Sequence, residues 1–266
     1  MSTKVVLTIA GSDSSGGAGI QADLKTFEAF GVFGMSVVTV LTAQNTKGVT
    51  DIVDVPSAFI KAQLEAVFDD FEISAIKIGM LYSNEIIDTV REFIKDLDIP
   101  IVFDPVFISK AGSKLLSADA IKNMKSLFPY VTLVTPNLFE AKELLGYEFA
   151  SSDSLENIFT LPCAVVIKNH IQEINDHQRS VDTLFIKREK FIFDTPYIES
   201  TATHGTGCSF SSAIAANLSL GKSLQESIQM AKKFIYLGIK NAPHIGSQNG
   251  PISHKIAGEI CHIKEN

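Results

Sequence analysis

Cysteine is scarce in this sequence, since only Cys163, Cys208 and Cys261 occur among 266 residues. They are odd in number and far apart, which excludes a disulfide framework and fits a reducing compartment. No Cys-x-x-Cys or His-x-x-x-His spacing is present, so the common zinc-binding arrangements are excluded as well.

Long apolar runs are also missing. Polar Thr8, Ser12 and Asp13 interrupt the first apolar stretch, so neither a signal peptide nor a membrane-spanning helix is predicted and the chain is expected to be cytoplasmic. The net charge of −7 argues against a general role on nucleic acids or membrane surfaces. The phosphate-binding pattern G-x-x-x-x-G-K-[ST] does not occur. No internal repeat or low-complexity linker divides the chain, so one domain over residues 1–266 is expected.

The sequence does contain a regular alternation of short β-branched runs and longer amphipathic segments. This alternation predicts an α/β protein with three layers, in which helices cover both faces of a central, mostly parallel sheet with a small antiparallel edge. Residues 146–160 and 171–180 are predicted to be loops, and the last ~20 residues are ambiguous. We expect strands at 5–9, 36–41, 73–78, 101–103, 131–134 and 164–167, a hairpin at 181–186 and 190–193, and helices at 20–30, 56–68, 85–97, 118–127, 137–145, 206–219 and 223–240.

A glycine-rich segment, residues 11–19, follows the first predicted strand. Its glycines would let the backbone approach a ligand closely. Residues 17–22 match the loose dinucleotide pattern G-x-G-x-x-A, but no carboxylate follows the second strand before Asp51, so that kind of nucleotide site is poorly supported. We interpret the segment as a ligand-binding turn, with a flexible connection as the alternative.

The run Thr203-His204-Gly205-Thr206-Gly207-Cys208 opens a helix rich in small residues. A helix N-terminus carries unpaired N–H groups and the positive end of the helix dipole, and therefore binds phosphate. The dipole is also expected to lower the pKa of Cys208, whose thiolate could accept the proton of a substrate hydroxyl during phosphoryl transfer. The run predicts the catalytic phosphate turn of an ATP-dependent kinase. The alternative is a tightly packed helix start with a structural cysteine.

Charged residues at strand ends supply further candidates. Asp104 and Glu140 follow predicted strands and could hold Mg²⁺ through water and substrate phosphates. Asn137 with Glu140 is equally a helix-capping pair, and this alternative stays open. Lys168 leaves an apolar strand and is either a phosphate ligand or a solvated lysine.

In their order along the chain, these motifs resemble the ribokinase-like superfamily, and within it the hydroxymethylpyrimidine/phosphomethylpyrimidine kinases of thiamine biosynthesis. The resemblance covers nearly the whole chain. It implies a ribokinase-like fold and an ATP- and Mg²⁺-dependent enzyme that phosphorylates 4-amino-5-hydroxymethyl-2-methylpyrimidine and then its monophosphate. A homodimer is the expected assembly. The resemblance rests on residues 9–23, 41–46, 77–81, 104–106, 135–137 with 140–141, and 203–208.

The resemblance also implies roles for individual residues. Gln44 and Asp23 would bind the pyrimidine through paired donors and acceptors, with Gly11, Met80 and Val106 close to it. The remaining assignments are Asp104 and Glu140 for Mg²⁺ and the ATP phosphates, Lys168 and Asn137 for ATP phosphate, and Gly205, Thr206, Gly207 and Cys208 for the anion hole and catalysis.

Two departures from the family pattern are present. Phe107 stands where the family commonly has Met, which is expected to change a pocket wall. The run Ile167-Lys168-Asn169-His170 is one residue shorter than the family's Val-Lys-Gly-Gly-His and lacks both glycines, which is expected to shift the loop over the ATP phosphates. The altered Lys168 loop leaves open a non-catalytic pyrimidine-binding protein. The resemblance leaves open a second alternative, a pyridoxal/pyridoxine kinase of the same branch.

Overall fold

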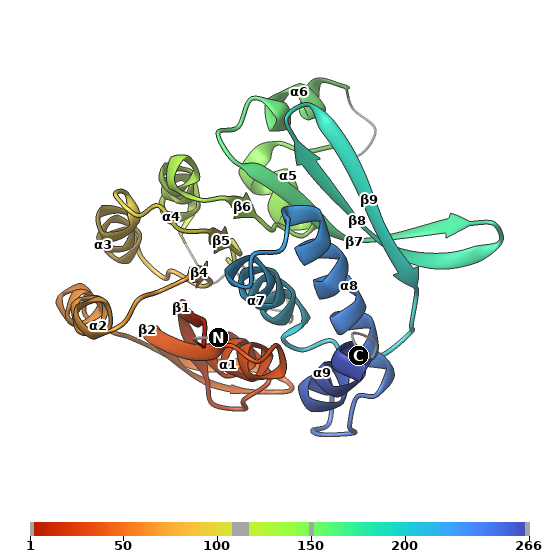
Figure 1. Ribbon diagram of the computed structural model, residues 1–266, viewed down its shortest axis with the longest axis horizontal. Helices are drawn as coiled ribbons and strands as arrows, with labels where there is room; N and C mark the ends of the chain where they lie inside the picture. The colour runs from red at the N-terminus through yellow and green to blue at the C-terminus, as the bar shows by residue number, and fades with distance from the viewer. Residues whose placement is uncertain (1–2, 108–116, 149–151, 264–266) are drawn as a thin grey trace.

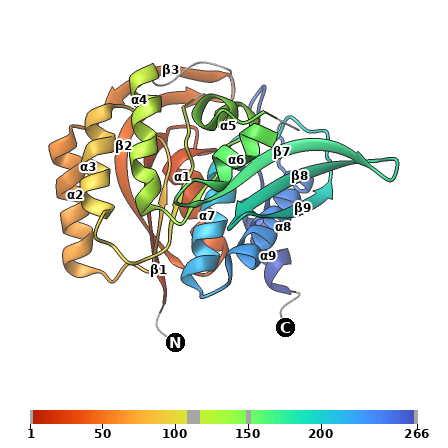
Figure 2. The same cartoon turned by 90° about the horizontal axis from the view of Figure 1, so that it is seen from above.

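The computed structural model describes residues 3–107, 117–148 and 152–263. One nine-stranded sheet runs through this part of the chain, and helices cover both of its faces (Figure 1, Figure 2). The predicted three-layer α/β architecture is therefore confirmed. The strands are β1 (Val5–Asp13), β2 (Phe33–Asn45), β3 (Gly48–Asp54), β4 (Ala75–Ile78), β5 (Ile101–Phe103), β6 (Leu133–Val134), β7 (Ala164–Ile174), β8 (His177–Ile186) and β9 (Glu189–Pro196). The helices are α1 (Gly19–Ala29), α2 (Ser57–Asp70), α3 (Asn84–Ile94), α4 (Ala118–Asn123), the 3₁₀ helix η1 (Met124–Tyr130), α5 (Leu138–Leu145), α6 (Ser152–Phe159), α7 (Thr206–Ser219), α8 (Leu224–Lys240) and α9 (His254–Ile263).

The strand order is β3-β2-β1-β4-β5-β6-β7-β8-β9. The strands from β2 to β7 run parallel, while β3 pairs antiparallel with β2, and β8 and β9 continue antiparallel from β7. The predicted loop at 171–180 is wrong, because β7 and β8 extend through it and turn at Asn175 and Asp176, both with positive φ. The residues of this hairpin are mostly polar, so they do not show the alternation of apolar and polar residues that predicts a strand. The strand β3, at the opposite edge of the sheet, was not predicted for the same reason.

Alternating residues of the central strands pack on opposite faces of the sheet, as the period of a β-strand requires. Leu7 packs with residues of α2 and α3, such as Leu64 and Val90. Its neighbour Val6 packs with residues of α1 and α7, such as Phe27. Figure 1 shows these two helical layers on either side of the sheet.

Three segments differ from the predicted helices. The predicted helix 118–127 consists of two elements, the α-helix α4 and the 3₁₀ helix η1, which contains Pro129. A 3₁₀ helix is common at the end of an α-helix. The predicted loop 146–160 contains α6, and residues 149–151 lie outside the described residues. The ambiguous C-terminal segment forms α9.

The parallel strands bring their carboxyl ends to one edge of the sheet. β1 ends at Asp13, β5 is followed by Asp104, and β6 is followed closely by Asn137. The N-terminus of α7 lies beside this edge, because the Gly207 backbone is close to the Lys168 and Asp104 side chains. Ligands of open parallel sheets bind at such an edge.

Candidate active site

A cavity of about 170 Å³ opens at the carboxyl ends of the parallel strands. Gln44 comes from β2, Asp104 follows β5, and Lys168 comes from β7, so residues far apart in the sequence meet here. The predicted site residues that line it are Gly11, Gln44, Met80, Asp104, Val106, Asn137, Glu140, Lys168, Gly205, Thr206, Gly207 and Cys208. Asp23 is the predicted site residue that is not part of its lining.

The predicted phosphate turn forms the start of α7. Gly205 precedes the first helical residue with φ of 77°, a conformation that strongly favours glycine. A Cβ at Gly205 would lie 1.8 Å from the backbone oxygen of Gly17, so only glycine allows the two glycine-rich turns to touch. The N-terminus of a 14-residue helix thus borders the cavity, and its N–H groups and dipole favour an anion there.

The Cys208 side chain is half-buried and lines the cavity. Burial raises the pKa of its thiol to about 11, although the Lys77 ammonium and a hydrogen bond with the Gly19 backbone act in the opposite direction. The expectation of a lowered pKa is therefore wrong. The loss of solvent around the sulfur outweighs the nearby positive charge.

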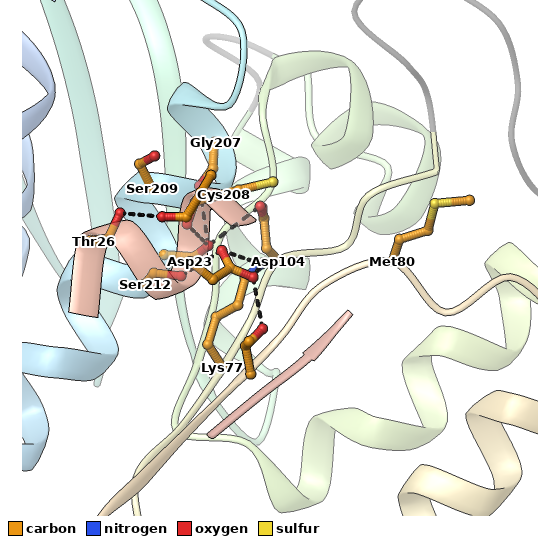
Figure 3. A network of polar contacts seen from close by, with 12 residues as sticks. Asp23, Thr26, Lys77, Met80, Asp104, Gly207, Cys208, Ser209 and Ser212 are labelled. Atoms are coloured by element: carbon orange, nitrogen blue, oxygen red, sulfur yellow. Dashed lines mark hydrogen bonds and ion pairs between the residues drawn. The ribbon is translucent and has the colours of Figure 1, made fainter. Parts of the chain in front are cut away.

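Asp23 lies behind the cavity lining, where it is buried, and Figure 3 shows the polar network around it. Its carboxylate accepts hydrogen bonds from Lys77 Nζ at 2.8 and 2.9 Å, from Thr8 Oγ1 at 2.7 Å and from Ser212 Oγ at 2.7 Å. Both side chains of the Asp23–Lys77 pair are fully buried, and Lys77 itself lines the cavity. Direct contact between Asp23 and a bound ring does not fit this geometry. Asp23 holds Lys77, a cavity residue that sequence analysis did not single out.

Lys168 and Asp104 form a second buried pair, with Lys168 Nζ 2.5 Å from Asp104 Oδ1. Burial lowers the pKa of Lys168, but the Asp104 and Glu140 carboxylates outweigh it, and the pKa lies above its usual value. Burial raises the pKa of Glu140 to about 7, with Asp104 adding to the rise and Lys168 opposing it. The helix-capping alternative is confirmed, because Asn137 and Glu140 form a reciprocal capping box at the start of α5. Glu140 still faces the cavity.

The two departures from the family pattern have different consequences. Phe107 is fully buried in the core with residues such as Phe103 and does not line the cavity, so the expected change of a pocket wall is wrong. The shortened segment after Ile167 forms a bulge between Ile167 and His170. Lys168 nevertheless lies at the cavity, where its backbone bridges to Asn137 in the neighbouring segment.

Two further cavity residues, Asp13 and His204, were not assigned a role from sequence. His204 Nε2 lies 2.8 Å from Asp13 Oδ2, and both side chains are buried. Asp13 follows the first predicted strand, in the glycine-rich segment, and His204 lies within the phosphate-turn motif. Their places in these two motifs could have marked them as candidate site residues, but only the fold shows that they are in contact.

A second cavity of about 280 Å³ lies on the other side of the phosphate turn. Lys168, Thr206 and Gly207 line both cavities. Apolar residues of α8, such as Ile235 and Ile239, form part of the second cavity. At its polar end, Lys232 Nζ lies 2.9 Å from Asp182 Oδ2 and donates to Ser180 Oγ at 2.9 Å. The two cavities therefore meet at one lysine and one helix N-terminus.

Metal-binding clusters and membrane-spanning helices are both absent from the part of the chain that the structure describes. The described residues contain no group of three or more His, Cys, Asp or Glu side chains placed to hold a metal ion. Among the helices within residues 3–107, 117–148 and 152–263, none is long and apolar enough to span a bilayer.

Fold and site together define a small-molecule kinase of the ribokinase-like class. Residues 13–253 match the phosphomethylpyrimidine kinase family, and the chain belongs to that family. It is 42% identical over 259 residues to the hydroxymethylpyrimidine/phosphomethylpyrimidine kinase of Haemophilus influenzae, covering 94% of this chain and 96% of the relative.

Two solved structures are similar over most of their length. Pyridoxal kinase from Bacillus subtilis, solved as an ADP complex, has a TM-score of 0.85 and 35% identity, covering 96% of this chain and 98% of that one. Phosphomethylpyrimidine kinase from Clostridium difficile has a TM-score of 0.75 and 41% identity, covering 88% of this chain and 98% of that one. The fold is thus shared by kinases that are named for two different acceptors, pyridoxal and phosphomethylpyrimidine.

Proposed function

We propose that this protein is an ATP-dependent kinase of thiamine biosynthesis, acting with residues 1–266 as one domain. It phosphorylates the hydroxymethyl group of 4-amino-5-hydroxymethyl-2-methylpyrimidine and then converts the monophosphate to the diphosphate. The observation that carries the proposal is the meeting of two cavities at Lys168, Thr206 and Gly207. One cavity can take the acceptor ring and the other the nucleotide, so that the transferred phosphate lies between them.

The first cavity is assigned to the acceptor ring. Gln44 supplies an amide with both donor and acceptor, and Gly11, Met80 and Val106 supply the wall around the ring. A Cβ at Gly11 would lie 2.8 Å from Val40 Cγ2, so glycine is needed for this wall of the cavity to pack against β2. Asp23 contributes indirectly by holding Lys77.

The second cavity is assigned to ATP. Its apolar walls suit a purine base, and Lys168 with the start of α7 suits the terminal phosphates. The relative from Bacillus subtilis was solved with ADP, which supports a nucleotide at this fold.

Mg²⁺ is the proposed cofactor. Asp104 and Glu140 offer hard oxygen donors beside the phosphate turn, and a Mg²⁺ ion commonly uses one or two carboxylates together with substrate phosphates. These residues fit the ion, with Asn137 shaping the Glu140 side of the site through the capping box. When bound, Mg²⁺ would neutralise phosphate charge.

Cys208 is the proposed base for the first phosphorylation. The hydroxymethyl oxygen attacks the γ-phosphorus of ATP, the bond from that phosphorus to the ADP oxygen breaks, and the hydroxyl proton moves to the Cys208 thiolate. Gly205, Thr206 and Gly207 hold the transferred group at the helix N-terminus. Lys77 supports the thiolate, since its positive charge opposes the rise in the pKa of Cys208 that burial causes.

A coupled assay of ADP release tests this proposal with the pyrimidine alcohol and its monophosphate as separate acceptors. Turnover of both is expected, and turnover of neither contradicts the proposal. Calorimetric binding of the alcohol to Cys208→Ala separates a kinase from a pure binding protein. A kinase loses turnover in this variant and keeps binding, whereas a binding protein shows no turnover before the substitution either.

Vitamin B6 aldehydes are the second candidate substrates. The similarity to a pyridoxal kinase at 35% identity and a TM-score of 0.85 favours this candidate. The family match and the relative from Haemophilus influenzae favour the pyrimidine. The ratio of kcat/KM values for the two acceptors decides between them.

We further propose a cytoplasmic homodimer, with small molecules rather than nucleic acid or membranes as its ligands. Leu41 and Val53 are paired across β2 and β3 and are at least half exposed, and Phe59 on α2 is exposed as well. An apolar edge of this kind is typical of an interface between copies. Sedimentation analysis is expected to show a dimer, and Val53→Glu is expected to yield monomers. A monomeric wild-type protein contradicts the proposal.

A further inference from the structure

A buried ion pair forms part of the wall of the second cavity. Lys232 Nζ, from α8, lies 2.9 Å from Asp182 Oδ2 on β8, and the two side chains are only 5% and 3% exposed. Both residues line the cavity, as does Ser180, whose Oγ accepts a hydrogen bond from Lys232 Nζ at 2.9 Å. The attraction between two buried charges often does no more than offset the cost of removing them from water, and apolar residues of similar volume stabilise a fold equally well. The stability of the fold alone therefore does not explain a pair at this position.

The Lys232 ammonium has one hydrogen more than it has acceptors in the described part of the protein. An ammonium can donate three hydrogen bonds, and those of Lys232 to Asp182 and Ser180 use two of its hydrogens. Ile235, one turn further along α8, lines the same cavity and has no acceptor in its side chain. The third hydrogen is therefore available to a ligand in the cavity.

The pairing of β7 with β8 places Asp182 beside the segment that carries Lys168. Residues 167 and 183 are paired across the two strands, as are residues 170 and 181, so Asp182 lies opposite the bulge at residues 168–169. Lys168 and Lys232 both line the second cavity. The wall of this cavity therefore carries two ammonium groups, one at the phosphate turn and a second held by the neighbouring strand.

The charges around the second cavity favour a ligand with several negative charges. Within the described residues, the charged side chains of its lining are Lys168, Lys232 and Asp182, so positive charge exceeds negative charge by one unit. The N-terminus of α7, at Thr206 and Gly207, adds the positive end of a helix dipole. A chain of phosphates supplies both the negative charge and the acceptor oxygens that these groups can bind.

We propose that Lys232, held by Asp182 and Ser180, is a nucleotide-binding residue that donates its third hydrogen to an oxygen of the phosphate chain, beyond the phosphate that Lys168 contacts. The inference rests on the proposed nucleotide cavity and deepens it. Asp182 fixes the place of the ammonium and limits the positive charge that the cavity wall must hold before the nucleotide binds.

Calorimetric binding of ADP and of adenosine, both in the presence of Mg²⁺, tests this role. Adenosine contains the base and the ribose without phosphate. The test variant combines Lys232→Met with Asp182→Asn, which removes both charges at nearly constant volume and leaves no uncompensated buried charge. The dissociation constant of ADP is expected to rise about tenfold or more, because a hydrogen bond from a charged donor is lost. The dissociation constant of adenosine is expected to change by less than about twofold, because adenosine lacks the group that Lys232 binds.

Arg179→Met is the matched control. It breaks the ion pair between Arg179 on β8 and Asp194 on β9, which lie 2.6 Å apart, and neither residue belongs to the lining of the second cavity. The dissociation constant of ADP is expected to stay unchanged in this variant. Thermal unfolding checks that each variant folds. Should the double variant not fold, Lys232→Gln keeps a hydrogen-bond donor for Asp182 without the positive charge, and it is expected to weaken ADP binding about tenfold as well.

The outcomes separate this inference from the proposed function. Unchanged ADP binding in the folded variants overturns the role of Lys232, and so does an equal loss for ADP and adenosine, because such a loss does not depend on phosphate. The companion variant Ile235→Trp places a larger side chain in the second cavity and so addresses the cavity itself. ADP binding that is unaffected by Ile235→Trp contradicts the assignment of this cavity to the nucleotide. Loss of ADP binding in Ile235→Trp, together with unchanged binding in the Lys232 variants, overturns the role of Lys232 alone.

Discussion

Asp23 and Lys77 form an ion pair at 2.8 Å in which neither side chain has exposed surface. Asp23 comes from α1 and Lys77 from β4, so the pair joins a helix to the sheet below the acceptor cavity. Thr8 and Ser212 complete the hydrogen bonding of the carboxylate. The pair therefore fixes the floor of the site.

Removing one partner leaves an uncompensated buried charge. Asp23→Ala is expected to lower the free energy of unfolding by about 3–5 kcal/mol, measured by urea denaturation. The control is Asp88→Ala, which breaks the partly exposed pair of Asp88 with Arg91 at 2.8 Å and is expected to cost less than about 1 kcal/mol. Similar small losses in both variants would show that the buried pair is not structurally important.

The two phosphorylations make different demands on Cys208. The first acceptor is an alcohol whose proton must leave, whereas the second is a phosphate monoester that is largely ionised at neutral pH. Cys208→Ser is therefore expected to lower kcat of the first step by about 100-fold or more and to affect the second step far less. Separate assays with alcohol and monophosphate measure the two effects. Equal losses in both steps would assign Cys208 to the phosphate turn rather than to proton transfer.

The raised pKa of Cys208 predicts a pH dependence for the first step. The active form is the thiolate, which becomes abundant only as the pH approaches about 11. The logarithm of kcat/KM for the alcohol should therefore rise with a slope of about one between roughly pH 7 and 10. Cys208→Ser should lack this rise. A wild-type profile that is flat over this range argues against a thiolate base.

The phosphate turn at the start of α7 can adopt its shape only if Gly205 contacts the glycine-rich turn at Gly17. Gly205 has φ of 77°, and a Cβ there would lie 1.8 Å from the Gly17 oxygen. Gly221 has φ of 83°, and a Cβ there would meet nothing within 4 Å, so it provides a matched control for backbone strain alone. Gly221→Ala should cost about 1–2 kcal/mol of stability with activity retained.

Gly205→Ala introduces the same backbone strain as Gly221→Ala and, in addition, a steric clash between the new Cβ and the Gly17 oxygen. We expect kcat to fall by about 100-fold, since a displacement of about 1 Å in a positioning element has effects of this size. Steady-state kinetics on folded protein measures it. If both alanine variants keep wild-type kcat, the contact between the turns is not needed for catalysis.

The sequence patterns predicted the parts of the fold that have a strong period. Strands such as β1 and amphipathic helices such as α3 lie close to their expected positions, because their apolar residues must face a core. The distal half of the β7–β8 hairpin, residues 171–180, was predicted as a loop, because it is polar and mostly exposed. Its pairing depends on backbone hydrogen bonds that leave little trace in side-chain composition.

The glycine-containing motif predicted where the phosphate turn lies. Gly205 to Cys208 lie at a helix N-terminus beside the cavity, as expected. The pKa of Cys208 was predicted in the wrong direction, because burial is a property of the assembled fold. The role of Asp23 also depended on tertiary contacts, since its partner Lys77 lies on another element.

The most direct test of the central claim compares kcat/KM for 4-amino-5-hydroxymethyl-2-methylpyrimidine and for pyridoxal, with the same enzyme, ATP and Mg²⁺ concentrations. The assigned acceptor site predicts a value at least about tenfold higher for the pyrimidine, the size of effect expected from about 1.4 kcal/mol of selective recognition. A higher value for pyridoxal would contradict the assignment of this protein as a pyrimidine kinase.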